Sequence, residues 1–172
     1  MSVASFQIQE TRFEVQEDDL AAHELTVRSV PRPYRVRLAP GAALEQIGRA
    51  LASGPRARLL ADERVYGLHL GGLALAPERR LLLRASEETK SLAGGVVPVI
   101  DWLAEAGMTK SDPLVVVGGG IVQDIAGFAA LLFKRGIPWT FFPTTLLSQC
   151  DSCIGAKAGV NHGRSPTPLT PQ

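Results

Sequence analysis

The sequence predicts an α/β fold, in which a parallel sheet is covered by helices on both faces. Three observations support this prediction. From residue 57 onward, short apolar runs alternate with amphipathic stretches, as in repeated β-α-β units. The run 114–117 is apolar and β-branched, as in a buried parallel strand, and three glycines follow it at 118–120. The next stretch carries one apolar helical stripe, formed by Ile121, Ile125, Phe128 and Leu132.

The N-terminal residues do not follow this pattern. Residues 1–22 are polar and acidic, and we expect a polar N-terminal arm or an irregular edge segment there. The stretches 23–30 and 34–38 alternate loosely between apolar and polar residues, and a Pro-Arg-Pro turn separates them. They are therefore expected to pair as a β-hairpin at a sheet edge.

The elements of the α/β part follow from periodicity and from the residues that end each run. Gly54-Pro55 closes the first helix, and Asp62 ends the first strand. Ser86 is a good N-cap for the long third helix, which Gly107 stops. The expected strands are 58–61, 80–84, 114–117 and 137–142, and the expected helices are 41–51, 63–70, 86–103 and the one between 121 and Gly136.

The C-terminal stretch 164–172 has three prolines in its last seven residues, so it cannot continue a helix or a central strand. The expected division is an arm at 1–22, a nucleotide-binding α/β domain at 23–163 and a proline-rich tail at 164–172.

Composition excludes several classes of function. Hydrophobic residues make up 45% and the net charge is +1, with Lys and Arg scattered, which argues against nucleic-acid or membrane partners. The N-terminus is acidic and has no apolar core, so it is not a secretory signal, and we expect a cytoplasmic protein. Cys150 and Cys153 form a C-x-x-C, for which two ordinary reduced thiols are favoured over a redox pair or a zinc site.

The glycine turn is the first candidate site. Strand, glycines and helix start together leave backbone N–H groups pointing outward, and a phosphate can sit on these donors, helped by the helix dipole. The alternative is a tight strand-to-helix turn without a ligand. We favour the phosphate site because three consecutive glycines cost backbone entropy that a simple turn does not require.

Ligands of a parallel sheet bind at the carboxyl ends of its strands, and four polar clusters fall there: Asp62, the group 87–90, the turn 118–124 and Thr144-Thr145. A nucleotide across this edge would place its pyrophosphate on the glycine turn, phosphate or ribose oxygens on the threonines and a ribose hydroxyl on Asp62. Asp62 is equally well a solvated turn carboxylate, and the threonines would also serve as a helix N-cap.

A denser polar cluster follows the threonines. Within twelve residues it combines Asp151, Ser152, Lys157, Asn161 and His162, interleaved with glycines. A carboxylate, an ammonium, an amide and an imidazole on such a segment suit a polyhydroxylated anionic substrate, whose carboxylate or phosphate would pair with the lysine. The alternative is a solvated loop.

Five segments carry a family resemblance. They are EETKSL at 87–92, GGGIVQD at 118–124, KRGIP at 134–138, PTTLLSQ at 143–149 and DSCIGAKAGVNH at 151–162. In order and spacing they resemble 3-dehydroquinate synthase and, more widely, the sugar phosphate cyclases, which include 2-epi-5-epi-valiolone and 2-deoxy-scyllo-inosose synthases. The resemblance is specific from Glu87 to His162 and weak from Tyr34 to Ser86.

The resemblance implies the Rossmann-like, NAD-binding N-terminal domain of the dehydroquinate synthase-like fold. The enzymes it points to are shikimate-pathway lyases that use NAD and a divalent metal, Zn or Co, on a seven-carbon sugar phosphate, and that are homodimers when full length. In that chemistry a ring hydroxyl is oxidised transiently, phosphate is eliminated, the ketone is reduced back and an aldol step closes a carbocycle.

Residue roles carry over position by position. The implied substrate contacts are Asp151, Lys157 and Asn161, and Arg135 would reach the substrate of a neighbouring subunit. The implied NAD contacts are Asp62, Glu87, Lys90, Gly118, Gly119, Gly120, Ile121, Val122, Asp124, Thr144, Thr145 and Lys157.

The sequence also departs from the family pattern. Gln123 stands where the family usually has a glycine, Ala156 replaces the second glycine before the lysine, and the lysine expected after Asn161-His162 is missing. The helical domain that supplies a glutamate and two histidines to the metal is missing too, so we expect a truncated or frameshifted chain, inactive by itself. Alternatives are a related cyclase for another sugar phosphate, a non-catalytic nucleotide-binding remnant and a metal-dependent alcohol dehydrogenase, although the last would not predict the segment 151–162.

Overall fold

The computed structural model describes residues 3–8, 11–16, 24–27, 34–37, 43–152, 158–162 and 165–169. The chain divides into two compact units, Met1–Gly41 and Ala42–Gln172.

The described part of the first unit consists of two antiparallel hairpins. β3 (Glu24–Val27) pairs with β4 (Tyr34–Arg37), which confirms the hairpin expected there. β1 (Val3–Ile8) pairs with β2 (Thr11–Gln16), where the sequence suggested an irregular arm. The register pairs Val3 with Gln16 and Ile8 with Thr11, so the two strands pair over their full length. The division into domains at residues 22 and 163 stays a prediction.

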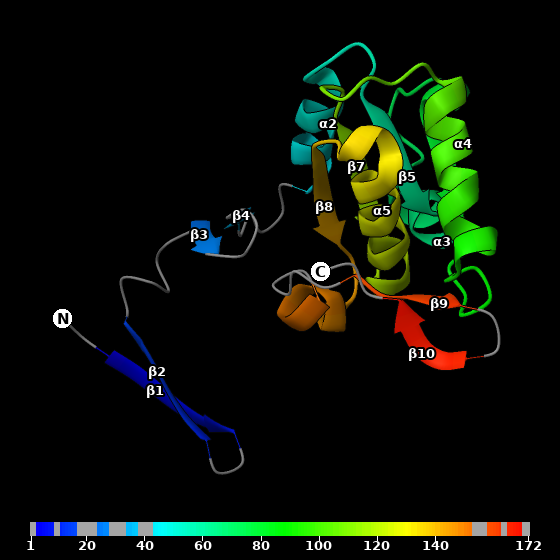
Figure 1. The fold of residues 1–172 in the computed structure, drawn as a ribbon. Helices are drawn as coiled ribbons and strands as arrows, with labels where there is room; N and C mark the ends of the chain where they lie inside the picture. The colour runs from blue at the N-terminus through cyan, green and yellow to red at the C-terminus, as the bar shows by residue number, and fades with distance from the viewer. Residues whose placement is uncertain are drawn as a thin grey trace. The chain divides into compact units, whose positions relative to one another are not determined.

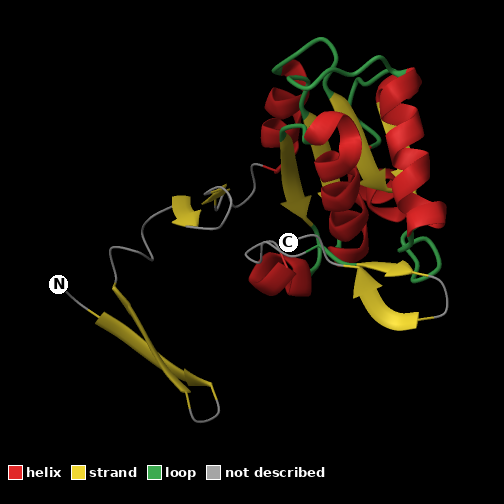
Figure 2. Cartoon of the chain, viewed as in Figure 1, coloured by secondary structure: helices red, strands yellow, loops and turns green. Residues whose placement is uncertain are grey.

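The second unit is built on a four-stranded sheet in the order β6-β5-β7-β8, and all three pairings are parallel. The predicted parallel sheet is therefore confirmed, and Figures 1 and 2 show its strands between helices. β7 is buried at all five positions, as its unbroken apolar run requires. The strands are β5 (Arg58–Asp62), β6 (Arg80–Leu83), β7 (Leu114–Gly118) and β8 (Trp139–Pro143).

Helices cover both faces of the sheet. Leu114 and Val116 of β7 belong to one core with α4 (Val97–Glu105) and α5 (Gly120–Leu132). Val115 and Val117 belong to the other, with α2 (Ala43–Ala52) and with the stretch α3 (Glu63–Val65) and η1 (Tyr66–Leu70). This alternation follows from the two-residue period of a strand. None of the helices within the described ranges has both the length and the apolarity needed to cross a bilayer.

Several short elements connect or extend this core. β9 (Val160–His162) and β10 (Ser165–Leu169) form a separate antiparallel pair, so the proline-rich stretch adds no strand to the central sheet, as expected. The short helical turns are η2 (Pro77–Arg79), η3 (Leu92–Val96), η4 (Phe133–Arg135) and η5 (Ser148–Ser152).

The third helix begins later than predicted. Ser86 is not its N-cap but closes a turn, in which Thr89 N donates to Ser86 Oγ at 3.2 Å. The N-cap is Ser91, whose hydroxyl accepts from Gly94 N at 3.0 Å. Gly95 then presses against α5, where an added Cβ would come within 2.8 Å of Ile125 Cδ1. This close approach requires glycine and fixes where the helix starts.

The inward face of α5 also differs slightly from the predicted stripe. Ile125 and Phe128 are buried as expected, but Leu132 is 53% exposed. The helix instead turns Val122 and Ala129 inward, both fully buried.

Candidate functional site

The glycine turn joins β7 to α5 at the carboxyl end of the sheet, which lies at the bottom of Figure 1. Gly119 is the N-cap of α5, with extended backbone and no side chain of its own to cap the first N–H groups of the helix. An added Cβ would come within 2.8 Å of Val122 Cβ at Gly118 and 3.1 Å of Thr145 Cγ2 at Gly119. A Cβ at Gly118 would therefore clash with Val122, and one at Gly119 would have to push Thr145 aside slightly.

Thr144 and Thr145 lie directly over the turn. Thr144 N donates to Gly118 O at 2.9 Å. Thr145 and Ser148 form a reciprocal cap: Ser148 N donates to Thr145 Oγ1 and Thr145 N donates to Ser148 Oγ, both at 3.2 Å. Thr145 is therefore a helix cap, the second of its two interpretations, while Thr144 is exposed and its hydroxyl is available at the turn.

A second group of predicted residues meets beside the turn. Lys90 Nζ lies 2.6 Å from Asp124 Oδ2, and Gly159 N donates to Asp124 Oδ1 at 3.2 Å. Asn161 N donates to Lys90 O at 2.8 Å, and its carboxamide donates to Glu87 O at 3.1 Å and Glu87 Oε2 at 3.3 Å. Residues from three distant parts of the sequence thus form one polar cluster.

Asp62 and Asp151 lie at the same edge of the sheet. Asp62 ends β5, next to β7, and its Oδ1 accepts from Val65 N at 3.0 Å, so this carboxylate caps α3. Asp151 is exposed on η5. A cavity of about 430 Å³ opens beside the cluster, lined by Arg84, Ser86, Glu88, Thr89 and Gly94.

Other predicted residues fall elsewhere. Ile121 is half-buried and Val122 fully buried, so any ligand contact from Val122 is limited to its backbone. Arg135 is exposed in the turn before β8, at the opposite end of the strands, with positive φ angles at Lys134 (52°) and Arg135 (63°). The structure does not bring Arg135 to the glycine turn of its own chain. Lys157 lies outside the described residues.

Sequence reasoning missed Ser148 and the contact between Gln123 and Ser152, which organise this edge. Ser148 is fully buried, Gln123 is 5% exposed, and Gln123 Nε2 donates to Ser152 O at 2.5 Å. The spacing Thr145-x-x-Ser148 resembles a capping box and was available in the sequence. The contact between Gln123 and Ser152 joins residues 29 apart and had no local signal.

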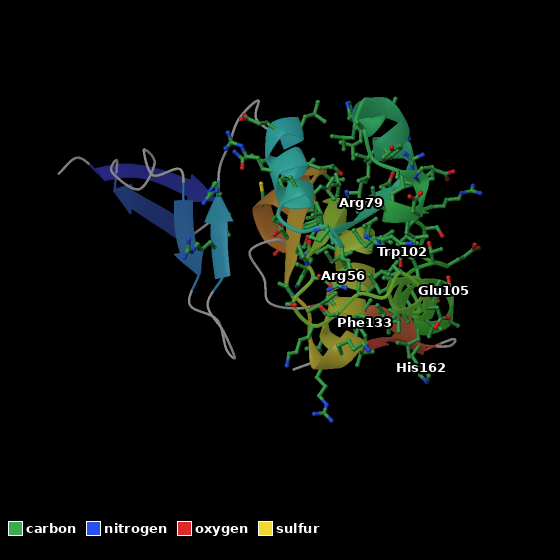
Figure 3. The ribbon with its side chains drawn as sticks, turned by 90° about the horizontal axis from the view of Figure 1, so that it is seen from above. Arg56, Arg79, Trp102, Glu105, Phe133 and His162 are labelled. Carbon is green, nitrogen blue, oxygen red and sulfur yellow. The ribbon has the colours of Figure 1, made fainter. Side chains whose placement is uncertain are left out.

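The resolved pKa shifts belong to the opposite, amino end of the strands. Thr109 donates to Asp112 Oδ2 from its backbone N at 2.7 Å and its hydroxyl at 2.8 Å, and these bonds lower the pKa of the Asp112 carboxyl. Arg56 Nε adds a contact at 2.9 Å. Burial, followed by the charge of Arg79, lowers the pKa of Arg58. Figure 3 views this end and labels Arg56 and Arg79.

These features define a class of protein: an α/β domain with a glycine turn and a polar cluster at the carboxyl edge of a parallel sheet. A model of the family described as 3-dehydroquinate synthase N-terminal matches residues 80–166. The chain therefore belongs to this family, as the resemblance indicated.

Relatives agree with this assignment. A 3-dehydroquinate synthase of Cereibacter sphaeroides is 39% identical over 139 residues, which are 76% of this chain and 37% of that protein. The 2-epi-5-epi-valiolone synthase of Streptomyces hygroscopicus, solved with NAD⁺ and Zn²⁺ bound, is 32% identical with a TM-score of 0.56, over 66% of this chain and 35% of that chain. A 2-deoxy-scyllo-inosose synthase, solved with carbaglucose-6-phosphate, NAD⁺ and Co²⁺, is 25% identical with a TM-score of 0.68. The match covers 86% of this chain and 43% of that chain. The chain thus spans well under half the length of these relatives.

Proposed function

We propose that this chain is the NAD-binding part of a sugar phosphate cyclase of the 3-dehydroquinate synthase type, acting on a seven-carbon sugar phosphate in the shikimate pathway. The observation that carries the proposal is the glycine turn at the start of α5, packed against Thr145 and flanked by the cluster of Lys90, Asp124 and Asn161. Family membership supports the same proposal.

The residues of the turn fit a dinucleotide. No side chain projects from Gly118, Gly119 or Gly120, and the uncapped N-terminus of α5 offers N–H donors and a partial positive charge to a pyrophosphate. The exposed Thr144 would bind a phosphate or ribose oxygen, and Asp62 and Lys90 would contact the riboses. NAD, when bound, supplies a hydride acceptor for a substrate hydroxyl and returns the hydride within one turnover.

The described residues do not fit a divalent metal. No group of three or more His, Cys, Asp or Glu lies close enough together within the described ranges to hold one, and a catalytic metal site usually takes three protein ligands. We derive no step through a metal from this chain. We infer that the 172-residue polypeptide is inactive by itself, and that the active form is a homodimer with a further domain.

We assign substrate binding to η5 and the segment that follows it. Asp151 would orient hydroxyls and Lys157 would pair with a phosphate or carboxylate. Asn161 stays a predicted substrate contact, and its carboxamide nitrogen also donates to Glu87 O and Glu87 Oε2. We infer that Asn161 holds the cluster together as well.

A chimera tests the proposal. The residues of this chain that align with the Cereibacter sphaeroides relative are exchanged into that protein, and phosphate release is measured with a seven-carbon sugar phosphate, NAD⁺ and Co²⁺. We expect phosphate release, with the unmodified relative as the positive control. A chimera with native circular dichroism that releases no phosphate from seven-carbon substrates contradicts the proposal.

The same assay separates the alternatives. Phosphate release from a different sugar phosphate in a panel of six- and seven-carbon substrates identifies a related cyclase. Binding of NAD⁺ without release from any of them identifies a non-catalytic nucleotide-binding module.

A further inference from the structure

Two consecutive residues of α5 hold the backbone on either side of the stretch 153–157. Gln123 donates from Nε2 to Ser152 O at 2.5 Å, and Asp124 accepts at Oδ1 from Gly159 N at 3.2 Å. Both residues lie near the start of the helix that the glycine turn begins, and Gln123 N itself donates to Gly119 O at 3.0 Å. The element that offers its N-terminus to a phosphate therefore also holds the neighbouring polar segment.

The segment 144–152 arches over the glycine turn as a consequence. At its start, the methyl of Thr145 packs on Gly119, and Ser148 caps the next turn. At its end, Ser152 Oγ lies 3.8 Å from where a Cβ of Gly120 would stand. Asp151 is the exposed residue next to this second anchor.

Gln123 is almost fully buried, so burying its amide has a cost that the hydrogen bond to Ser152 must offset. The side chain is 5% exposed, and Gln123 Oε1 is buried without a hydrogen-bond partner within the described residues. Burying the amide oxygen without a partner is unfavourable, so the hydrogen bond that the amide nitrogen donates to Ser152 O has to offset this cost. A glycine at this position would make no such bond.

We propose that Gln123 is a positioning residue, which fixes Ser152 over the glycine turn and thereby sets the position of Asp151 relative to a phosphate bound there. The proposal rests on the proposed function for the role of Asp151. This role explains why Gln123 stands where the family usually has glycine, because its side chain points at η5 and not into the phosphate loop.

Amide hydrogen exchange of the 172-residue chain tests this without any ligand. Three variants are compared with the wild type: Gln123→Met, which keeps length but cannot donate, Gln123→Glu, and Gln46→Met as a matched control on α2. In Gln123→Met, amide exchange across residues 148–152 should accelerate about fivefold or more, which corresponds to the free energy of about one lost hydrogen bond. Exchange across 114–118 should stay unchanged, and Gln46→Met should change neither segment.

Gln123→Glu adds a pH profile that reports the hydrogen bond to Ser152 O directly. The introduced carboxyl donates to Ser152 O only when protonated, and burial raises its pKa. Protection of 148–152, corrected for intrinsic exchange rates, should therefore be retained at acidic pH and lost at alkaline pH, while Gln123→Met shows no such pH dependence.

Equal protection of 148–152 in Gln123→Met and the wild type overturns the proposal. Equal acceleration in 114–118 overturns it too, because Gln123 would then support the fold as a whole. Neither result affects the proposed function, which the phosphate-release assay decides separately.

Discussion

Replacing Lys90 by Met should destabilise the second unit by about 2 kcal/mol, a value that follows from the burial of its ion pair. Lys90 Nζ and Asp124 Oδ2 lie 2.6 Å apart, and the two side chains are 22% and 15% exposed. The gross attraction between charges at this distance is roughly 6 kcal/mol near a protein surface. Exposed pairs contribute about 0–1 kcal/mol, and breaking a fully buried pair costs about 3–5 kcal/mol, so this pair lies between these limits.

The carboxylate left behind in Lys90→Met is not entirely unpaired. Asp124 Oδ1 still accepts from Gly159 N, which places the expected loss below that of an isolated buried charge. A loss of about 2 kcal/mol lowers the midpoint of thermal unfolding by about 8 °C for a unit of this size. The matched control is Lys110→Met, which removes an exposed lysine and should change the midpoint little.

A double-mutant cycle isolates the pair itself. Asp124→Asn keeps an acceptor for Gly159 N but removes the charge, and the double variant with Lys90→Met completes the cycle. Urea unfolding followed by circular dichroism should give a coupling energy of about 1–2 kcal/mol. A coupling below about 0.3 kcal/mol would refute the argument, because the two groups would then be solvated independently.

Three further outcomes are expected. Gly95→Ala should lower stability by about 1–3 kcal/mol in urea unfolding, because the new methyl meets Thr89 O and Ile125, whereas an unchanged midpoint would mean that the turn 86–91 can move aside. Lys157→Ala in the active chimera should nearly abolish phosphate release while leaving circular dichroism unchanged, and an unaltered rate would remove Lys157 from the site. Asp112 has a folded pKa below its ordinary value of 3.8, so it stabilises the fold above that pH and this contribution is lost as pH falls below it. Asp112→Asn should make acid unfolding less steep there, and identical acid transitions would contradict this.

Local patterns were sufficient to predict the parallel sheet. The run 114–117 is apolar without interruption because β7 is covered on both faces, and the turn residues around 58–62 delimit β5 by their own chemistry. These signals lie within a few residues of the element they define.

Contacts between distant segments account for most of what the sequence did not predict. The sequence predicted a cap at Ser86, but the cap is Ser91, and it is followed by the close packing of Gly95 on α5. The contact between the Asn161 carboxamide and Glu87 joins residues 74 apart and had no local signal in the sequence. Gln123 was noted only as a departure from a family glycine, because nothing near it in the sequence identifies Ser152 as its partner.

A single methyl group added at the glycine turn should weaken ligand binding while the chain still folds. At Gly119 an added Cβ would lie 3.1 Å from Thr145 Cγ2, so Gly119→Ala has to push the threonine aside by a few tenths of an ångström. The methyl also intrudes on the donors at the start of α5, which a phosphate would have to approach closely.

A matched substitution shows what the same methyl does elsewhere. Gly48 lies inside α2 with open space around its Cβ position, so Gly48→Ala should stabilise the chain by about 0.5–1 kcal/mol. In the chimera, Gly119→Ala should raise the concentration of NAD⁺ needed for half-maximal phosphate release at least tenfold, whereas Gly48→Ala should leave it unchanged. If both variants need the same NAD⁺ concentration as the parent, the glycines serve only the turn between β7 and α5, and the pyrophosphate has to bind elsewhere.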